Sequence, residues 1–541
     1  MSTPATSYQK KIWWLIGVTI IAKIILSYFL ELGNDEVYYY TYAVQPDWNH
    51  FDHPGMIGWM MRLTSLNLHW VSTLSMRLGS IICAGLATLV IFKTATIIKD
   101  EKAGYIAAWM YTLSIYTSII AGLFVLPDSP QLLFFTLSIY WMTKWVIQPS
   151  SFTTKHWLLL GGLIGLATLS KVHGLYLWVG FGAFILFHQI KTLQNARVYF
   201  SILITLLCIV PIVYWNFQND FITYRYHSQR VMHTGLLLDS FLQQIIGEII
   251  YQNPLVYLTA IIALLNVKKI KAQLAGASQN VIITQKDSSD ATSRAQTINL
   301  LLWLSLPLIF TFWTLSLFNP TLPHWTGPGF IGLFIIAGVY WSQRLENKQD
   351  FSHKSMPLIL KGALGLLGAS ILGFLLLVYT LPQQLGSTKM ENLGEYNPIN
   401  DVTGWETFSE SFTKIVAQDK KIGLMQETDP IISHKWFPAG HLLFYTAKPL
   451  NKRVIAIGSL EDIHKFAWLN NTQDALTIGE NAYCIVPSNL PVDPNKLYGN
   501  YFETISKPDT IPMISKGVLL RNFYVYRLMH CKQVPVEIIK K

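Results

Sequence analysis

The segment from Glu31 to Arg62, ELGNDEVYYYTYAVQPDWNHFDHPGMIGWMMR, separates two long apolar runs of the chain. It gathers carboxylates, two histidines and many tyrosines and tryptophans, which is the densest group of titratable and aromatic side chains in the sequence. Such a loop beside a membrane suits chemistry on a polar substrate. An equal alternative on residue content alone is a solvated loop with a belt of Tyr and Trp, which favour the membrane interface.

The composition assigns the chain to the membrane proteins. Hydrophobic residues make up 51% and charged residues 13% of the 541 residues, whereas a soluble protein carries about 25% charged residues. Apolar runs near the length that crosses a bilayer recur, so we predict a polytopic α-helical membrane protein. The net charge of +10 says little about nucleic acid, because the basic residues of membrane proteins collect in cytoplasmic loops.

About eleven transmembrane helices are predicted within residues 1–381. Clusters of Lys and Arg precede the first span and follow the second, fourth, sixth, eighth and tenth. The positive-inside rule places the N-terminus and the connector 266–296 in the cytoplasm, and the C-terminal region outside. The spans with two predicted ends are 12–30, 71–92, 103–125, 131–147, 157–169, 241–265, 326–341 and 356–381, and three more end near His188, Trp215 and Phe318.

This topology puts the polar segments of interest on one face of the membrane. The segments on the outer face are the loop 31–70, LPDSP (126–130), SKVHG (170–174), 216–240 and NPTLPHW (319–325). Structural polar residues scattered at random would not gather on one side. We therefore predict a functional site at the outer face, with 31–70 as its catalytic loop.

Residues 382–541 have a different pattern. Charged residues return, no apolar run of spanning length occurs, and short β-like runs alternate with helical stretches such as 405–418. We predict a small extracytoplasmic α/β domain. An oxidising compartment permits a disulfide between Cys484 and Cys531, and two buried thiols are an equal alternative.

Five motifs in sequence order carry a resemblance to a known family. They are NDEVYYYTYAVQPDWNHFDHPGMIGWMMRL (34–63), LPDSPQLLFF (126–135), GLATLSKVHGLYL (165–177), PIVYWNFQNDFITYRYHSQR (211–230) and LPHWTGPGF (322–330). Up to about residue 345, the sequence resembles bacterial glycosyltransferases of the protein O-mannosyltransferase superfamily, which are family 39-like. The aminoarabinose lipid A transferases are similar but more distant.

That resemblance implies a GT-C fold and a function. The expected enzyme is a glycosyltransferase of the bacterial cytoplasmic membrane that takes a sugar from a polyprenyl-phosphate donor, by an inverting mechanism. The expected acceptor is a lipid, a glycan or a protein on the non-cytoplasmic face. Two other functions stay open, namely a transporter or flippase of polar lipids and a catalytically silent scaffold. A transporter typically carries internal repeats, and none is visible between the halves of the sequence.

Asp35 in the NDE run matches the catalytic aspartate of the resembled family. Glycosyl transfer needs a base for the acceptor hydroxyl, and a carboxylate just past the first span suits that role. Glu36 is expected to raise the pKa of its neighbour or to hold an acceptor hydroxyl, and Tyr38 is expected to contact substrate. The structural alternative is a solvated pair of carboxylates at the start of the loop.

Basic residues on the same face are candidates for binding the leaving phosphate. The resemblance implies a phosphate contact at the position of His53, a residue that is partly charged at neutral pH. Lys171 would supply a permanent charge beside His173, and snorkelling to the interface is the alternative for it. Arg225 and Arg230 are further candidates, with a solvated basic loop as the alternative.

Three more residues complete the predicted substrate site. Asp128 matches the family's PDSP turn, where it would bind a sugar hydroxyl or cap the following helix. His324 and Trp325 would stack on a sugar ring or on lipid, or would belong to an interfacial aromatic belt.

A divalent cation is a further hypothesis, since Asp52, His50 and His53 are residue types that bind such ions. Their spacing matches no closed metal site, and the four cysteines have no CxxC or Cys/His spacing. No cofactor is therefore firmly implied, and Asp52 is assigned to substrate binding. The absence of a glycine-rich phosphate loop favours a lipid-linked donor over a nucleotide sugar.

Overall fold

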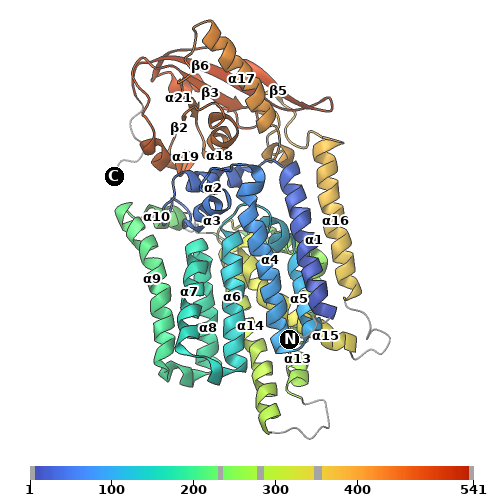
Figure 1. The fold of residues 1–541 in the computed structure, drawn as a ribbon. Helices are drawn as coiled ribbons and strands as arrows, with labels where there is room; N and C mark the ends of the chain where they lie inside the picture. The colour runs from blue at the N-terminus through green and yellow to red at the C-terminus, as the bar shows by residue number, and fades with distance from the viewer. Residues whose placement is uncertain (1–6, 230–234, 277–284, 347–355, 535–541) are drawn as a thin grey trace. The chain divides into compact units, whose positions relative to one another are not determined.

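The computed structural model describes residues 7–229, 235–276, 285–346 and 356–534 (Figure 1). Its contacts divide the chain into two compact units. The helical unit contains Met1–Ile25, Asp52–Met60 and Arg77–Ala369, and the mixed unit contains Leu26–Phe51, Met61–Met76 and Ser370–Lys541. Most of the predicted outer loop therefore groups with the C-terminal region, and each unit is described by itself.

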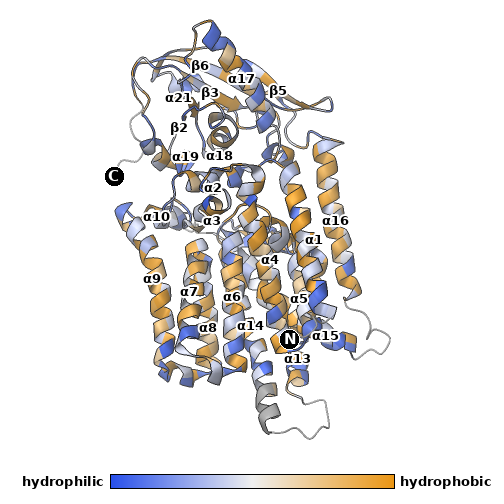
Figure 2. Ribbon diagram, in the orientation of Figure 1, coloured by the Kyte–Doolittle hydropathy of each residue, from blue (hydrophilic) through white to orange (hydrophobic). Residues whose placement is uncertain are grey.

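Every segment predicted to span the membrane contains a helix. Among the described residues, five helical segments are long and apolar enough to cross a bilayer, and hydrophobic colours dominate them in Figure 2. They are α1 (Ser7–Phe29), α4 (Thr73–Ile98), α9 (Ala196–Gln218), the part Ala291–Ser316 of α14 (Gln285–Ser316), and α16 (Leu358–Tyr379). Shorter helices occupy other predicted spans, namely α5 (Glu101–Leu113), α6 (Asp128–Ile147), α7 (Thr154–Ser170), α8 (Tyr176–His188) and α15 (Phe330–Glu346).

The predicted eighth span, 241–265, is not one continuous helix. α11 (Leu238–Tyr251) and α12 (Pro254–Leu265) meet at a bend of 100°. Pro254 has no N–H with which to continue the preceding helix, and Asn253 adopts a positive φ of 63°. The Asn253 side chain stabilises the break, since it accepts a hydrogen bond from Leu255 N–H and donates to two backbone carbonyls.

The predicted third span, 103–125, also ends early. α5 stops at Leu113, and the chain continues through the π-helical turn η1 (Tyr116–Ile120) before α6 begins. Such π-helical turns are frequent at functional sites. This one brings Tyr116 to the start of α6, where the LPDSP motif lies.

Glycines let the helices of this unit approach one another closely. α7 packs against both α6 and α9, and a Cβ at Gly161 would lie 2.1 Å from the Ser201 carbonyl oxygen of α9. The Thr205 hydroxyl uses this close approach to donate to the Gly161 carbonyl at 2.8 Å. In a membrane, close backbone packing replaces the hydrophobic effect as a source of helix association. α7, which ends just before Lys171, is therefore packed closely against α9.

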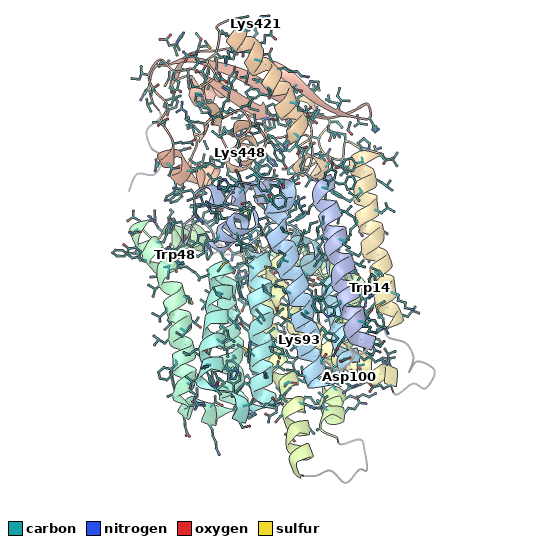
Figure 3. The ribbon with its side chains drawn as sticks, viewed as in Figure 1. Trp14, Trp48, Lys93, Asp100, Lys421 and Lys448 are labelled. Carbon is teal, nitrogen blue, oxygen red and sulfur yellow. The ribbon has the colours of Figure 1, made fainter. Side chains whose placement is uncertain are left out.

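A charged cluster closes one end of the helical unit. Lys99 Nζ lies 2.8 Å from a carboxylate oxygen of Glu346. Asp100 caps α5, because its carboxylate accepts a hydrogen bond from Ala103 N–H at 2.7 Å. Lys93 and Asp100 mark this end of α4 and α5 in Figure 3. Lys99, from the basic cluster after the second predicted span, therefore packs with polar residues of α15.

The mixed unit is built on a six-stranded sheet of order β2–β1–β3–β6–β4, with β5 also paired to β6. β1 is parallel to β2 and β3, whereas β6 is antiparallel to β3, β4 and β5. The strands are β1 (Ile431–Ser433), β2 (Val454–Ala456), β3 (Ala482–Pro487), β4 (Phe502–Ile505), β5 (Asp509–Ser515) and β6 (Val518–Cys531). The α/β composition predicted for the C-terminal region is confirmed.

The cysteines of this region are free thiols. Cys484 on β3 and Cys531 at the end of β6 are both buried in one hydrophobic cluster. The structure thus matches the alternative of two buried thiols and contains no disulfide between them. The predicted helix at 405–418 is α17 (Trp405–Lys421), whose Phe408 packs on Phe523 of β6 at 4.4 Å between ring centroids.

The predicted outer loop contains regular structure. α2 (Asn34–Val44) and α3 (Met56–Thr64) lie within it. All of α2 from Glu36 to Ala43 is buried, so the belt interpretation is wrong for its tyrosines. α2 packs against α18 (Trp436–His441), where a Cβ at Gly440 would lie 2.9 Å from the Val37 side chain.

Candidate active site

A buried ion pair lies where α6, α7 and η1 meet. The ammonium of Lys171 donates to both carboxylate oxygens of Asp128, at 3.0 Å to Oδ1 and 2.8 Å to Oδ2. Only 3% of Lys171 and 2% of Asp128 is exposed. Asp128 Oδ1 also accepts a hydrogen bond from the Tyr116 hydroxyl at 2.8 Å. One carboxylate therefore joins three elements.

The local chain geometry sets this pairing. Lys171 follows the last residue of α7 and has an extended backbone, with φ of −156° and ψ of 134°. Asp128 is the first residue of α6. Pro127 and Pro130 prevent the preceding segment from continuing as a helix and favour a new helix start. Two helix ends thus present a cation and an anion to each other.

Two alternatives from the sequence are wrong for this pair. Lys171 does not snorkel to an interface, because its ammonium is buried and bonded to Asp128. The start of α6 has no side-chain capping hydrogen bond, so Asp128 does not act as a helix cap. Burial alone would raise the pKa of the Asp128 carboxyl, but Lys171 holds that pKa below its usual range. The Asp128 carboxyl is therefore an anion at neutral pH.

Histidines near the pair are neutral. Burial lowers the pKa of His53 to about 4, with Asp52 opposing the shift and Lys171 adding to it. Burial, followed by Lys171, lowers the pKa of His324 to about 4 as well. The expectation of a partly charged His53 at neutral pH is therefore wrong. Each ring offers one N–H donor and one acceptor at pH 7 instead of a positive charge.

Aromatic contacts fix the positions of two of these rings. His324 stacks on Tyr116, with 6.4 Å between ring centroids and an interplanar angle of 21°. His173 packs against Phe312, at 4.9 Å, and against Trp325, at 6.2 Å. Among the described residues, His173 Nδ1 is buried and has no hydrogen-bond partner. A buried ring nitrogen in this state is unusual in proteins and suits a hydrogen bond to a ligand.

Of the remaining basic candidates, Arg225 lies on α10 (Ile222–Gln229). Arg225 is exposed there, and Arg230 lies outside the described residues. His227 of the same helix places its Nε2 3.0 Å from the carbonyl oxygen of Asp52, and its ring 6.3 Å from that of His53. α10 therefore contacts the segment that carries His53.

The divalent-cation hypothesis does not fit the residues present. Within the described ranges, no group of three or more His, Cys, Asp or Glu side chains is arranged to hold a metal ion. His50 is fully buried in the mixed unit, and its ring lies 3.7 Å from that of Tyr42. His50 is thus part of the aromatic packing.

Asp35, Glu36 and Tyr38 belong to the mixed unit. Asp35 is the second residue of α2, and its side chain is exposed. Glu36 is buried, and its Oε2 accepts a hydrogen bond from Gly33 N–H at 2.9 Å. Tyr38 is buried against the rings of Trp436 and His464. The structure uses Glu36 for capping and Tyr38 for packing, and it presents Asp35 as an exposed carboxylate on the first turn.

Sequence reasoning missed several partners of these residues. Tyr116 lies in an apolar run, so no local pattern distinguishes it from a core tyrosine. Asp401, His441 and Tyr445 bond to the segment before Asp35 from more than 360 positions away. The one local signal is Gly33, which precedes α2 where a capping side chain is usual.

Comparisons with known proteins agree with the predicted resemblance. Residues 52–215 match the family model of dolichyl-phosphate-mannose-protein mannosyltransferases. This range contains His53, Asp128, Lys171 and His173, and Asp35 lies before it. No curated protein sequence matches the chain.

The fold is similar to that of ArnT from Cupriavidus metallidurans. For the apo state, the TM-score is 0.60 at 12% identity, and the match covers 96% of this chain and 98% of ArnT. For ArnT bound to undecaprenyl phosphate, the TM-score is 0.53 at 12% identity, with 95% and 97% covered. The chain therefore has the helical GT-C membrane fold that the resemblance implied.

Proposed function

We propose that this protein is an integral-membrane glycosyltransferase that moves a sugar from a polyprenyl-phosphate donor to a lipid, glycan or protein acceptor. The observation that carries the proposal is the buried Lys171–Asp128 pair, set among neutral histidines within the segment that matches the mannosyltransferase family model. A cation held away from water interacts strongly with a phosphate. ArnT, which has the same fold, was solved with undecaprenyl phosphate, a ligand of this class.

The proposed reaction is a single displacement at the anomeric carbon of the sugar. The acceptor hydroxyl oxygen forms the new bond to that carbon, while the bond from the carbon to the phosphate oxygen breaks. Asp35 takes the hydroxyl proton, and polyprenyl phosphate leaves with the bonding electrons. Attack on the face opposite the leaving group inverts the anomeric configuration.

Lys171 is proposed to stabilise the negative charge that builds on the leaving phosphate oxygen. Asp128 keeps the Lys171 ammonium in one position through two hydrogen bonds. The neutral rings of His53, His173 and His324 would add N–H donors without adding further charge. Asp52, Arg225 and Trp325 are proposed to contact the rest of the donor.

The proposal includes the predicted topology in the bacterial cytoplasmic membrane. About eleven helices span it, the N-terminus and the connector 266–296 are cytoplasmic, and Asp35 and the C-terminal region are extracytoplasmic. The alternation of Lys/Arg clusters along the sequence supports this assignment. Helical segments lie within each predicted span, and five of them are long and apolar enough to cross a bilayer.

The test uses purified protein in proteoliposomes with a polyprenyl-phosphate sugar that carries a radiolabel in the sugar. A lipid and glycan extract of bacterial envelopes provides acceptors. A glycosyltransferase moves the label to an acceptor and releases polyprenyl phosphate, whereas a flippase moves intact donor between leaflets. Movement of intact donor without any release of polyprenyl phosphate would overturn the proposal.

A further inference from the structure

Three side chains from the C-terminal part of the mixed unit bond to the residues just before Asp35. The Tyr445 hydroxyl accepts a hydrogen bond from Leu32 N–H at 2.6 Å. Asp401 Oδ1 accepts one from Asn34 N–H at 2.9 Å. His441 Nε2 lies 2.9 Å from Asn34 Oδ1. The backbone that leads into the Asp35 turn is therefore held by residues far away in the sequence.

These hydrogen bonds provide acceptors for backbone N–H groups at the start of α2, where the sequence supplies no capping side chain at Gly33. The first N–H groups of a helix have no partners within the helix, and Gly33 at the cap position has no side chain to supply one. Asp401 fills that role for Asn34, and Glu36 fills it for Gly33 itself. A Cβ at Gly33 would lie 3.4 Å from Asp401 Oδ2, an ordinary van der Waals distance, so the Asp401 carboxylate packs directly against this position.

The capping is reciprocal, because a carboxylate from the segment before α2 also caps α17. Glu31, four residues before Asp35, accepts hydrogen bonds from the N–H groups of Gly404, Trp405 and Glu406 at 3.0, 2.8 and 3.2 Å. Gly404 is the cap residue of α17, and Trp405 and Glu406 are the first two residues of that helix. The segment before α2 thus caps α17, and the segment before α17 caps α2. The start of each helix therefore depends on a carboxylate from the segment that precedes the other helix.

The packing of α18 against α17 and α2 supports these capping contacts. His441 ends α18, and Tyr445 lies in the π-helical turn η9 (Leu442–Ala447) that follows it. The His441 ring stacks on Trp405 of α17, at 4.3 Å and 3°. Gly440 allows α18 to approach α2 closely at Val37. α2 is therefore packed and capped by the same set of C-terminal elements.

We infer that the C-terminal region has a role in catalysis, in which Asp401, His441 and Tyr445 are positioning residues that fix the first turn of α2 and so aim the Asp35 carboxylate. This inference rests on the proposed function of Asp35 as the base. It assigns the C-terminal region a task in turnover in addition to its own folding. Small displacements of a catalytic group lower turnover strongly, by about 100-fold for a shift of about 1 Å.

The experiment compares substitutions of Asp401 in single-turnover transfer from a polyprenyl-phosphate sugar. Asp401→Ala removes the oxygen that accepts from Asn34 N–H, so we expect the rate at saturating donor to fall about 10- to 100-fold. Donor affinity should be unchanged, because Asp401 does not contact donor in this account. Asp401→Asn keeps an acceptor oxygen without the charge, and it should restore the rate to within about threefold of the parent.

A second, smaller substitution tests the inference even if Asp401→Ala fails to fold. Tyr445→Phe deletes only the oxygen that accepts from Leu32 N–H, and it should lower the rate about fivefold. The matched control is Asp419→Asn, which alters a buried carboxylate of α17 that bonds Arg527 and Tyr483, both outside the segment before Asp35. This control should lower the melting temperature and leave the saturating rate unchanged.

Three outcomes would overturn the inference. The first is a parental rate in Asp401→Ala while Asp35→Asn is inactive. The second is a rate loss in Asp419→Asn equal to that in Asp401→Ala at the same loss of melting temperature. The third is a loss of donor affinity in place of the saturating rate. Full activity of Asp35→Asn is a separate result, since it would refute the assigned base and not the contacts around it.

Discussion

Lys171 and Asp128, separated by 43 positions in the sequence, form an ion pair from which solvent is almost excluded, with Nζ 2.8 Å from Oδ2. Taking two charges out of water is costly, and in many proteins apolar side chains would be as stable at such a site. The two charges of this pair therefore suit the binding of a charged ligand. In the proposed function this ligand is the lipid-linked phosphate, whose negative charge Lys171 would stabilise.

The first prediction separates the structural role of this pair from its catalytic role. Lys171→Met leaves the Asp128 carboxylate buried without its cation, so stability should fall by about 3–5 kcal/mol. Adding Asp128→Asn removes that charge, and the double variant should recover most of the melting temperature. Transfer should stay about 10- to 1,000-fold below the parent, because neither variant has the cation that stabilises the leaving phosphate. Melting curves and single-turnover assays measure the two effects; recovery of both stability and transfer in the double variant would make Lys171 a structural residue only.

The second prediction concerns acid stability. The pKa of His53 and of His324 is about 4 in the folded chain, against about 6.5 in the unfolded chain. The unfolded state therefore binds more protons between these values, so folding stability is full above pH 6.5 and falls as the pH drops towards 4. The loss should be on the order of 1 kcal/mol per pH unit for each histidine. Melting temperature against pH measures it, and His53→Phe should be less sensitive to acid than the parent.

The control for this prediction is His69→Ala, since His69 is exposed. Its melting temperature should follow the parental pH dependence. Transfer by His53→Ala should be reduced by the same factor at pH 6 and at pH 8, because the ring is neutral at both. A defect confined to low pH would mean that His53 is charged when it acts.

The third prediction concerns topology. A reporter inserted within the connector 266–296 should be cytoplasmic, and a reporter after residue 541 should be extracytoplasmic, because Lys/Arg clusters alternate between the predicted spans. Labelling with a reagent that does not cross the membrane checks both in intact cells. Equal labelling of the two positions would contradict the odd number of spans.

The sequence predicted the longest helices well, because a helix that crosses a bilayer needs about 20 apolar residues and a single sequence displays such a run. It predicted one continuous span at 241–265, although Asn253 and Pro254 carry a local signal for a bend. It identified Asp128 and Lys171 as candidates from motifs. Their pairing depends on how α6 and α7 pack, and residue spacing does not encode that contact.

The contacts around Asp35 could not be predicted from the sequence, for a similar reason. Asp401 lies 367 positions from Asn34, and nothing in either local pattern links the two. The partial burial of His53 was also missed, because a histidine in a polar loop has the same sequence signature whether it is solvated or packed. Its neutral charge follows from burial that only the fold determines.

The most direct test of the central claim is single-turnover transfer from a purified polyprenyl-phosphate sugar by the parent and by Asp35→Asn. Asp35 is exposed on a fixed first turn of α2, so the substitution should leave the melting temperature and the donor affinity unchanged. We predict that the rate of polyprenyl phosphate release falls about 100- to 10,000-fold, the range expected for the loss of a general base. Release by Asp35→Asn at the parental rate would contradict the account.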